Sequence, residues 1–278
     1  MRDREFEFTQ KDFEFLRGIA NQRTGIVVSD DKFDMFYSRL SRRVRKLGMS
    51  TFSEYCDLIR ANQDGDEMVE LVNSITTNLT AFFRENHHFE YLANTVIPEL
   101  LAKNSAERNI RIWSAGCSTG EEPYSLSITL NEVLAQVAGW DVKVLATDID
   151  SNVLARAASG VYPMERVNGL DKARLRRWFQ KGKGELGGKA RLKPEVRRLI
   201  EFGQLNLMQQ WSIDSPKDVI FCRNVIIYFD KESKIKLIDR YADNLKVGGY
   251  LFIGHSESLF KLTDRFELIG QTIYRKVK

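Results

Sequence analysis

The sequence is poor in the residues that cross-link small proteins. Only three cysteines occur among 278 residues, at Cys56, Cys117 and Cys222. They form no CxxC pair and no cluster with histidine, which argues against a disulfide framework and against a zinc site. We therefore predict free, buried thiols and no metal site.

Long apolar segments are also missing. A membrane-spanning helix needs about 18 or more apolar residues in a row, and no such run is present. The first residues, MRDREFEFTQKDFEF, carry too many charges for a secretory signal peptide. Internal repeats and low-complexity segments are absent as well. We expect a cytoplasmic protein without membrane insertion.

What remains is the composition of an ordinary globular protein, with 43% hydrophobic and 29% charged residues. A chain of 278 residues can form one large domain or two of ordinary size. The formal net charge of +4 is mild. It neither requires nor excludes an acidic partner, so the distribution of charge matters more than its sum.

The first 80 or so residues predict helices. Apolar residues recur at helical spacing within residues 13–20 and 36–47, and similar patterns predict helices over Thr51–Ala61 and Glu67–Thr76. No long stretch alternates with period two. Residues 1–80 are therefore predicted to form an all-helical domain.

After about residue 105, short apolar runs alternate with helical patterns. This alternation indicates βαβ units and a mainly parallel sheet, hence an α/β domain over residues 81–278. The predicted strands are Ile110–Ala115, Lys143–Asp150, Asp218–Val225, Tyr250–Gly254 after a break at Gly248-Gly249, and a final pair over 266–278. The predicted helices run from Pro123 to about Val137 and from Lys231 to Leu245.

A glycine-rich, basic stretch, Lys181–Lys193, interrupts this pattern, and Arg197–Phe202 after it can form a strand. We interpret the region of roughly 175–202 as a small β-hairpin insertion. A solvated loop would have a similar composition.

The turn Ser114–Ser125 is the first place to look for a ligand, because open α/β sheets bind ligands beyond the carboxyl ends of their strands. Gly116 and Gly120 permit a tight turn and close ligand approach. Their GxxxG spacing is not the GxGxxG pattern of dinucleotide sites. Glu121 and Glu122 follow, where a dinucleotide would place its pyrophosphate against a helix start.

Two carboxylates at this point would repel a phosphate and suit a cationic ligand without phosphates. S-adenosylmethionine, with its ammonium and sulfonium groups, fits that description. An acid at a helix start can also simply complement the helix dipole. We favour the dipole for Glu121 and the ligand for Glu122. Asp148 ends the second predicted strand, where an acid can accept hydrogen bonds from ribose hydroxyls.

Four segments resemble the signature stretches of chemotaxis receptor methyltransferases, the CheR family. They are TNLTAFFRENHHF (Thr77–Phe89), WSAGCSTGEEPYS (Trp113–Ser125), TDID (Thr147–Asp150) and FCRNVIIYFD (Phe221–Asp230), in that family's order. The resemblance covers essentially the whole chain. One departure is Gly116-Cys117, where many relatives carry two alanines; both positions keep a small residue.

The resemblance implies a class I S-adenosylmethionine methyltransferase fold, Rossmann-like, with an N-terminal all-helical domain and a small inserted antiparallel β-subdomain. It implies S-adenosyl-L-methionine as cofactor, S-adenosyl-L-homocysteine as product, and methyl esters on glutamate side chains of chemoreceptors. It also implies recruitment to membrane receptor arrays. The residues implied to bind the cofactor are Asn78, Thr80, Arg84, Glu122, Asp148, Asn206, Leu207, Arg223 and Asn224, and Arg84 and Tyr228 are the implied catalytic residues.

The chemistry explains why such a site needs no catalytic dyad. A glutamate side chain, with a reference pKa of about 4.3, is already an anionic nucleophile near neutral pH. Alignment of the reacting atoms can then contribute about 7–11 kcal/mol. Arg84 offers a planar fork that matches a carboxylate, and Tyr228 offers a rigid ring and a hydroxyl. The alternatives are a surface salt bridge with Glu85 or Glu90 for Arg84, and a core aromatic role for Tyr228.

The histidines invite other interpretations. His87 and His88 are adjacent on a predicted helix and should point about 100° apart, so packing roles are favoured over a shared ligand. His255 lies in GHSES, which lacks the final glycine of the hydrolase GxSxG motif.

A basic helix face is the predicted docking surface. Arg39, Arg42, Arg43 and Lys46 fall at i, i+3, i+4 and i+7, and no acid occurs between Met35 and Ser53. Acidic receptor helices are the expected partner, with a solvated face or nucleic acid as alternatives. In some family members the β-subdomain also binds a peptide from the receptor's C-terminal tail, and GELGG (Gly184–Gly188) resembles their glycine-containing loop.

Three other functions compete with this one. A nucleic-acid aminomethyltransferase would carry a (D/N)PP(Y/F) motif after the fourth strand, where this chain reads RNVIIYF. A non-enzymatic S-adenosylmethionine sensor would not need Arg84 and Tyr228. An NAD enzyme is disfavoured by Glu121 and Glu122.

Overall fold

The computed structural model describes residues 4–278, without the side chains of Gln136 and Glu185. Residues 1–3 of the predicted helical domain lie outside the described part. The chain forms two compact units. One comprises the chain up to Thr77 together with Tyr228–Ser233, and the other comprises Asn78–Ile227 with Lys234–Lys278.

The first unit is helical, as predicted. Its helices are α1 (Gln10–Thr24), α2 (Phe33–Lys46), α3 (Phe52–Ala61) and α4 (Asp66–Ile75). Thr9 forms a capping box with Asp12 at the start of α1, and Gly25 ends that helix at φ 74°.

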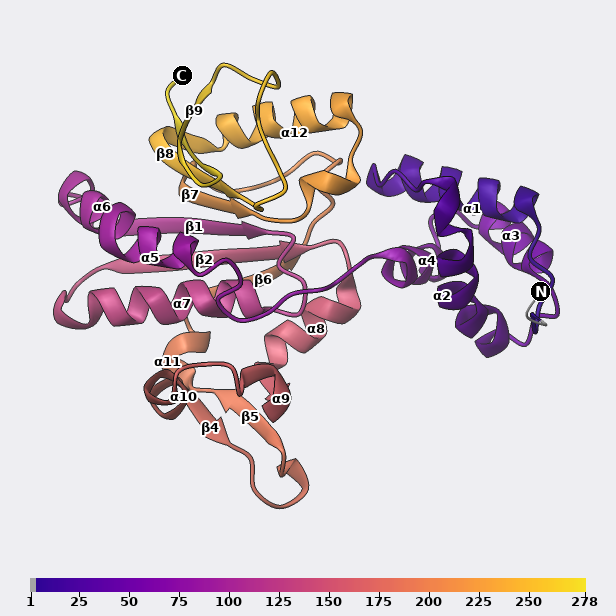
Figure 1. Cartoon of the computed structure of the whole chain (residues 1–278), viewed down its shortest axis with the longest axis horizontal. Coiled ribbons are helices and arrows are strands. Elements are labelled where there is room, and N and C mark those ends of the chain that lie inside the picture. Colours follow the sequence, from indigo (N-terminus) through magenta and orange to yellow (C-terminus); the bar gives the residue numbers. More distant parts are fainter. Residues whose placement is uncertain (1–3) are drawn as a thin grey trace. The chain divides into compact units, whose positions relative to one another are not determined.

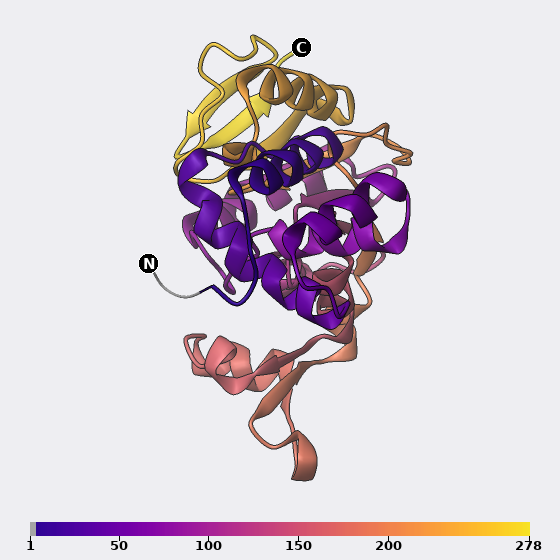
Figure 2. The same ribbon diagram turned by 90° about the vertical axis from the view of Figure 1, so that its right-hand side faces the viewer.

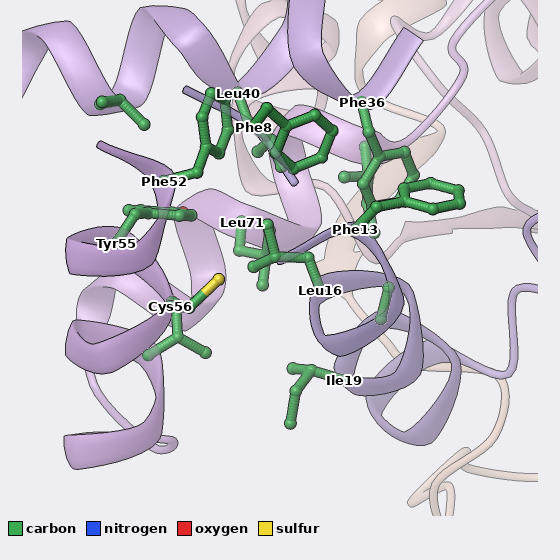
Figure 3. Packing of buried hydrophobic residues seen from close by; sticks show 14 of the residues in the cluster. Phe8, Phe13, Leu16, Ile19, Phe36, Leu40, Phe52, Tyr55, Cys56 and Leu71 are labelled. Atoms are coloured by element: carbon green, nitrogen blue, oxygen red, sulfur yellow. The ribbon is translucent and has the colours of Figure 1, made fainter. Parts of the chain in front are cut away.

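The core of this unit combines aromatic rings with aliphatic side chains (Figure 3). Phe8 packs against Phe52 with ring centroids 4.4 Å apart, and Phe13 meets Phe36 edge to face at 5.4 Å. Leu47, expected on the apolar face of α2, is 38% exposed because the helix ends one residue before it.

The second unit is built on a seven-stranded sheet of order β6-β2-β1-β7-β8-β10-β9. The first five strands in this order are parallel, and β10 pairs antiparallel with both β8 and β9. This is the predicted Rossmann-like sheet. Its strands are β1 (Asn109–Ala115), β2 (Asp141–Asp148), β6 (Ile200–Gln204), β7 (Lys217–Cys222), β8 (Leu245–Ile253), β9 (Phe266–Gly270) and β10 (Ile273–Lys276).

Helices cover both faces of this sheet, which explains why its parallel strands are apolar on both sides (Figure 1). On one face, Ile110 and Ile112 join a core with Leu126 and Phe89. On the other face, Trp113 packs edge to face on Tyr241, with ring centroids 5.3 Å apart. The helices are α5 (His87–Tyr91), α6 (Ile97–Lys103) after a π-helical turn at Leu92–Val96, α7 (Glu121–Val133), α8 (Ser151–Ser159) and α12 (Lys231–Asp243).

A smaller antiparallel sheet, of order β3-β5-β4, lies between α8 and β6 in the chain. In both Figure 1 and Figure 2 its β4–β5 hairpin extends away from the large sheet. The predicted hairpin is thus present, and the strand predicted at Arg197–Phe202 is β6. That strand, however, pairs with β2 in the large sheet. The elements here are β3 (Val161–Pro163), α9 (Met164–Val167), α10 (Lys172–Trp178), β4 (Phe179–Lys181), β5 (Lys189–Leu192) and α11 (Pro194–Arg197).

The predicted break at Gly248-Gly249 was wrong, because both glycines lie inside β8. The pairing of β8 with β7 shifts register between Lys217 and Val219, and Gly248 adopts φ 76°. Gly248 therefore permits a local irregularity in β8, and the strand continues beyond it.

Cys56, Cys117 and Cys222 are free and buried, as predicted. Within residues 4–278, no helix is long and apolar enough to cross a membrane.

Candidate functional site

The candidate site lies at the carboxyl ends of the parallel strands. β1 continues through α7 to β2 on one side, whereas β7 and β8 lie on its other side. The strand order therefore reverses between β1 and β7, and the loops that leave these strands diverge. Open α/β sheets bind their ligands at such a point.

The turn after β1 depends on two glycines. Gly116 has φ 83°, and a Cβ there would lie 2.4 Å from Cγ2 of Val225 in the loop after β7. Gly120 has φ 96° at the start of α7, and its Cβ would lie 2.8 Å from Cβ of Ala157 and from the Tyr162 hydroxyl. Side chains at either position would separate elements that now touch.

Glu122, in the first turn of α7, is buried between β1 and β7. Its Oε1 accepts a hydrogen bond from the Ser114 hydroxyl at 2.7 Å, and its Oε2 accepts one from Nη1 of Arg223 at 3.2 Å. Burial raises the pKa of Glu122, against the opposing effect of the Arg223 charge. Glu122 is therefore a carboxylate in a poorly solvated place, and a cationic ligand would stabilise it.

Glu121, the other acid at this helix start, is committed to the protein itself. It forms an ion pair with Arg166 and accepts a hydrogen bond from the Thr119 hydroxyl at 2.6 Å. Nη2 of Arg166 also donates to the carbonyl of Thr80 at 3.1 Å. Glu121 thus holds Thr80, a predicted cofactor residue, through one arginine.

Asp148 ends β2 and faces the turn after β1. Its Oδ2 accepts a hydrogen bond from the backbone N–H of Ser118 at 2.7 Å, and its Oδ1 accepts one from the N–H of Asp150 at 3.0 Å. The Ser118 hydroxyl in turn donates to the carbonyl of Asn78 at 3.0 Å, and Nδ2 of Asn78 donates to Oδ2 of Asp150 at 2.8 Å. The structure thus gathers Asn78 and Asp148, two predicted cofactor residues, into one network.

Burial raises the pKa of Asp148, although the N–H groups of Asp150 and Ser118 oppose this. The two carboxylate oxygens together offer about four acceptor positions, more than these backbone N–H groups use. Asp148 can therefore accept hydrogen bonds from ligand hydroxyls.

Asn206 and Leu207 follow β6, beside Asp148. The N–H of Leu205 donates to the Asp148 carbonyl at 2.9 Å, which fixes where this segment begins. Leu207 is buried, and its carbonyl accepts a hydrogen bond from Nη1 of Arg240 at 2.7 Å. The segment therefore offers an apolar side chain next to the strand ends.

Arg84 lies in a strained turn before α5. The residues on either side, Phe83 and Glu85, have φ of 52° and 54°, which are costly for residues other than glycine. Nη1 of Arg84 donates to the Leu79 carbonyl at 2.9 Å, and the carbonyl of Arg84 accepts a hydrogen bond from Arg223. The structure therefore holds the backbone of Arg84 tightly while its side chain stays half-buried.

Arg223 links three of these groups. Besides Glu122 and the Arg84 carbonyl, its Nη2 lies 3.4 Å from Oε2 of Glu85. Sequence reasoning had not singled out Glu85. The left-handed backbone at this position is invisible in the sequence, and the acid looked like a surface partner for Arg84.

Glu257 is a second residue that sequence reasoning missed. It is buried, and its carboxylate accepts hydrogen bonds from the N–H groups of Asn224 at 2.9 Å, Ile227 at 3.1 Å and Gly254 at 2.5 Å. These bonds fix the loop after β7, in which Asn224 has φ 60°. In the sequence, the GHSES motif draws attention through its histidine and its resemblance to a hydrolase turn, and not through this glutamate.

Tyr228 follows that loop and belongs to the first unit. Its carbonyl accepts a hydrogen bond from the N–H of Val27 at 2.8 Å, and its side chain is half-buried.

Only part of the basic face of α2 is free to contact a partner. Arg39 donates from Nη1 to the carbonyls of Ile75, at 2.5 Å, and Thr76, at 2.9 Å. Arg43 forms an ion pair with Glu67 on α4. Arg42 and Lys46 are exposed. The sequence did not reveal that α4 supplies acids to this face.

Two family models match consecutive parts of the chain. The all-alpha domain of CheR methyltransferases matches residues 11–76, and their SAM binding domain matches residues 78–275. The chain belongs to the CheR methyltransferase family. The enzyme is thus a methyltransferase with S-adenosyl-L-methionine as cofactor, and the predicted fold and cofactor are confirmed.

Several members of the family are similar over most of their length. The chain is 44% identical to a chemotaxis protein methyltransferase of Escherichia coli K12, over 94% of this chain and 89% of that protein. It is 44% identical to chemotaxis protein methyltransferase 2 of Pseudomonas aeruginosa, over 98% and 95% of the two chains. A probable chemotaxis protein methyltransferase of Rhizobium etli is 43% identical over 90% and 94%.

Proposed function

We propose that this enzyme transfers the methyl group of S-adenosylmethionine to glutamate side chains of chemoreceptors, the methyl-accepting chemotaxis proteins, as a protein-glutamate O-methyltransferase. The methyl esters would serve chemotactic adaptation. The observation that carries the proposal is a pair of buried carboxylates at the carboxyl ends of the strands. Glu122 lies in the first turn of α7, after β1, and Asp148 ends β2. The names of the relatives from Escherichia coli and Pseudomonas aeruginosa support the choice of substrate.

The donor groups fit the cofactor. Glu122 would hold its ammonium group, and Asp148 would accept hydrogen bonds from its ribose hydroxyls, since both oxygens of each carboxylate can take a further donor. Asn206 and Leu207 would flank its adenine. The network of Ser118 and Asn78 around Asp148 keeps that carboxylate in place.

Four more residues complete the proposed cofactor set. Thr80 and Asn78 approach from the segment before α5, and Arg223 and Asn224 from the loop after β7. Arg223 would act mainly through Glu122, which it holds. Asn224 is itself fixed by the carboxylate of Glu257 through its backbone N–H.

The bound cofactor supplies an electrophilic methyl group on a sulfonium. Arg84 would orient a carboxylate, either that of the incoming glutamate or that of the cofactor, with the two parallel donors of its guanidinium. Tyr228 would present its ring and hydroxyl near the reacting carbon. A glutamate side chain needs no base, so positioning is the main contribution of the protein.

We further propose a division of labour along the chain. Residues 1–80 would dock the acidic helices of the receptor, through Arg42 and Lys46 and with Arg39 and Arg43 holding the surface, and residues 81–278 would carry the reaction. The β-subdomain, roughly 175–202, could bind a tail peptide of the receptor. β4 is an edge strand of the small sheet, and an edge strand can add a peptide strand.

The test is to incubate the protein with methyl-labelled S-adenosylmethionine and membranes that contain chemoreceptors. Base should release the label as methanol, because an ester, unlike a methylated amine, is cleaved. Arg84→Ala and Tyr228→Phe should each reduce labelling strongly, whereas Arg156→Ala, on the exposed face of α8, should not. Base-stable label, or labelling of nucleic acid, would refute the assignment.

A further inference from the structure

All three histidines of the chain lie around one carboxylate, that of Glu85. Nδ1 of His255 is 2.9 Å from Oε1 of Glu85, and Nδ1 of His88 is 3.6 Å from Oε2. The rings of His87 and His88 are also close, with centroids 4.2 Å apart. The sequence suggested that these two rings diverge, but they stand at the first turn of α5, next to the strained turn at Glu85.

The hydrogen bonds of His88 determine its tautomer. Its Nε2 lies 3.0 Å from the carbonyl of Gln271 and 3.2 Å from the hydroxyl oxygen of Thr272, whose own proton goes to that carbonyl. Both neighbours therefore accept, so Nε2 must carry the proton. Nδ1 then bears a lone pair.

That lone pair is buried and lacks a donor. The His88 side chain is fully buried, and Nδ1 has no hydrogen-bond partner among the described residues. The lone pair of His88 Nδ1 and Oε2 of Glu85 face each other, 3.6 Å apart. Because both atoms are electron donors, a cation bound between them would stabilise the arrangement.

We propose that Glu85, His87 and His88 bind one divalent transition-metal ion, with Zn²⁺ the best match. One ligand atom from each of the three lies within 4.8 Å of those of the others. Tetrahedral zinc with bonds of about 2.0–2.1 Å spaces its ligands by about 3.3 Å, so small side-chain shifts close the site. Two imidazoles and one carboxylate form a known type of zinc ligand set that leaves a position for water.

The surroundings support such a site. The Nε2 proton of His88 is held by a backbone carbonyl, which is the usual outer-shell arrangement of a metal-binding histidine. His255 holds the other oxygen of Glu85 and so orients the carboxylate. The nearby Arg223 is opposed by two carboxylates, Glu85 and Glu122, which leaves the local charge negative. This inference is independent of the proposed function, because it concerns binding of the metal alone.

The test uses the full-length protein after chelator treatment. Zn²⁺ is titrated in competition with a chromophoric chelator, without cofactor or receptor, and Co²⁺ is added in parallel to record its visible absorption. We expect one ion per chain and a Co²⁺ spectrum typical of nitrogen and oxygen ligands in a four-coordinate site. His87→Ala should weaken Zn²⁺ binding by at least about tenfold, because even the loss of an outer-shell partner of a metal ligand has an effect of that size.

Two further variants keep the test decisive. Glu85→Gln retains the shape of the side chain and should weaken binding like His87→Ala. Glu90→Gln is the matched control, because it makes the same change on an exposed acid of α5 that is outside the ligand set, and it should bind Zn²⁺ as the wild type does. Equal binding by the wild type and His87→Ala, or equal weakening by Glu85→Gln and Glu90→Gln, would overturn the proposal. Thermal melts of each variant exclude a trivial loss of fold.

Discussion

Nη1 of Arg223 donates a hydrogen bond to Oε2 of Glu122 at 3.2 Å, and their side chains are only 2% and 11% exposed. This buried ion pair joins the end of β7 to the start of α7, which are separated by about 100 residues in the chain. It fixes the two loops between which the strand order of the sheet reverses. The site therefore depends on a pair whose members are costly to separate.

The first prediction follows from this pair. Arg223→Ala should destabilise the fold by about 3–5 kcal/mol, because it leaves Glu122 buried without its cation. Adding Glu122→Gln should recover part of that loss, since the charge is then gone. Chemical denaturation measures both, with the exposed Arg191→Ala as control. Additive losses in the double variant would contradict the idea that the two side chains act as a pair.

The second prediction concerns pH. Burial raises the pKa of both Glu122 and Asp148. Each should therefore become protonated at a higher pH than an exposed acid, whose pKa is about 4. Protonation removes the negative charge that would hold the ammonium group and weakens the acceptor for the ribose, so affinity for S-adenosylmethionine should fall as the pH is lowered.

Calorimetric titrations with S-adenosylhomocysteine at several pH values would measure this effect. Glu122→Gln and Asp148→Asn should each bind weakly at neutral pH and show a flatter pH dependence than the wild type. If both variants kept the affinity and pH profile of the wild type, neither carboxylate would contact the ligand.

The third prediction tests the turn after β1. Gly116→Ala adds a Cβ that would lie 2.4 Å from Cγ2 of Val225, at φ 83°. The left-handed backbone alone costs about 1–2 kcal/mol for a residue with a side chain. We expect lower stability and weaker cofactor binding, with a partial recovery on adding Val225→Ala.

Gly169→Ala is the matched control for Gly116→Ala. Nothing lies within 4 Å of a Cβ at Gly169, and its φ is not in the left-handed region. Thermal melts of the two alanine variants should therefore differ clearly. Equal melting temperatures would mean that the turn after β1 adjusts without cost.

The sequence predicted the layers of the fold well because apolar periodicity reports burial directly. The strand at Ile110–Ala115 and the helices at Phe52–Ala61 and Asp66–Ile75 appear within one or two residues of expectation. Glycines were harder, because a glycine marks either an end or a bulge. This ambiguity explains why Gly248 and Gly249 were predicted as a break although they lie inside β8.

Pairings between distant segments could not be predicted from spacing. Arg39 and Arg43 look like free cations in the sequence, yet Ile75 and Glu67 on α4 supply their partners. Likewise, Glu85 and Glu257 serve the site through left-handed backbone and through N–H groups of the loop after β7. Such roles depend on tertiary contacts that a single sequence does not encode locally.

The fourth prediction concerns Glu257 as a positioning residue. Glu257→Gln keeps the size of the side chain but turns an amide NH₂ toward the N–H groups of Asn224 and Gly254. Leaving one buried N–H without an acceptor should cost about 1–3 kcal/mol. Methyl transfer should slow more than cofactor affinity falls, because the loop leads to Tyr228.

Steady-state kinetics and cofactor titrations separate these two effects. Glu267→Gln, on the exposed face of β9, is the matched control and should leave both unchanged. A variant at Glu257 with normal kcat but a raised KM for the cofactor would show that the loop affects binding only.

The last prediction concerns docking. Arg42 and Lys46 are exposed on α2, whereas Arg39 and Arg43 are held by other parts of the first unit. Replacing both Arg42 and Lys46 with glutamate should therefore lower kcat/KM for an acidic receptor, most strongly at low salt, because charge complementarity mainly accelerates encounter. Affinity for the cofactor should not change. Lys11→Glu, an exposed charge reversal on α1, is the control. Should the double variant methylate receptors at the wild-type rate at low salt, the receptor must approach through another surface, and the edge strand β4 would be the next to test.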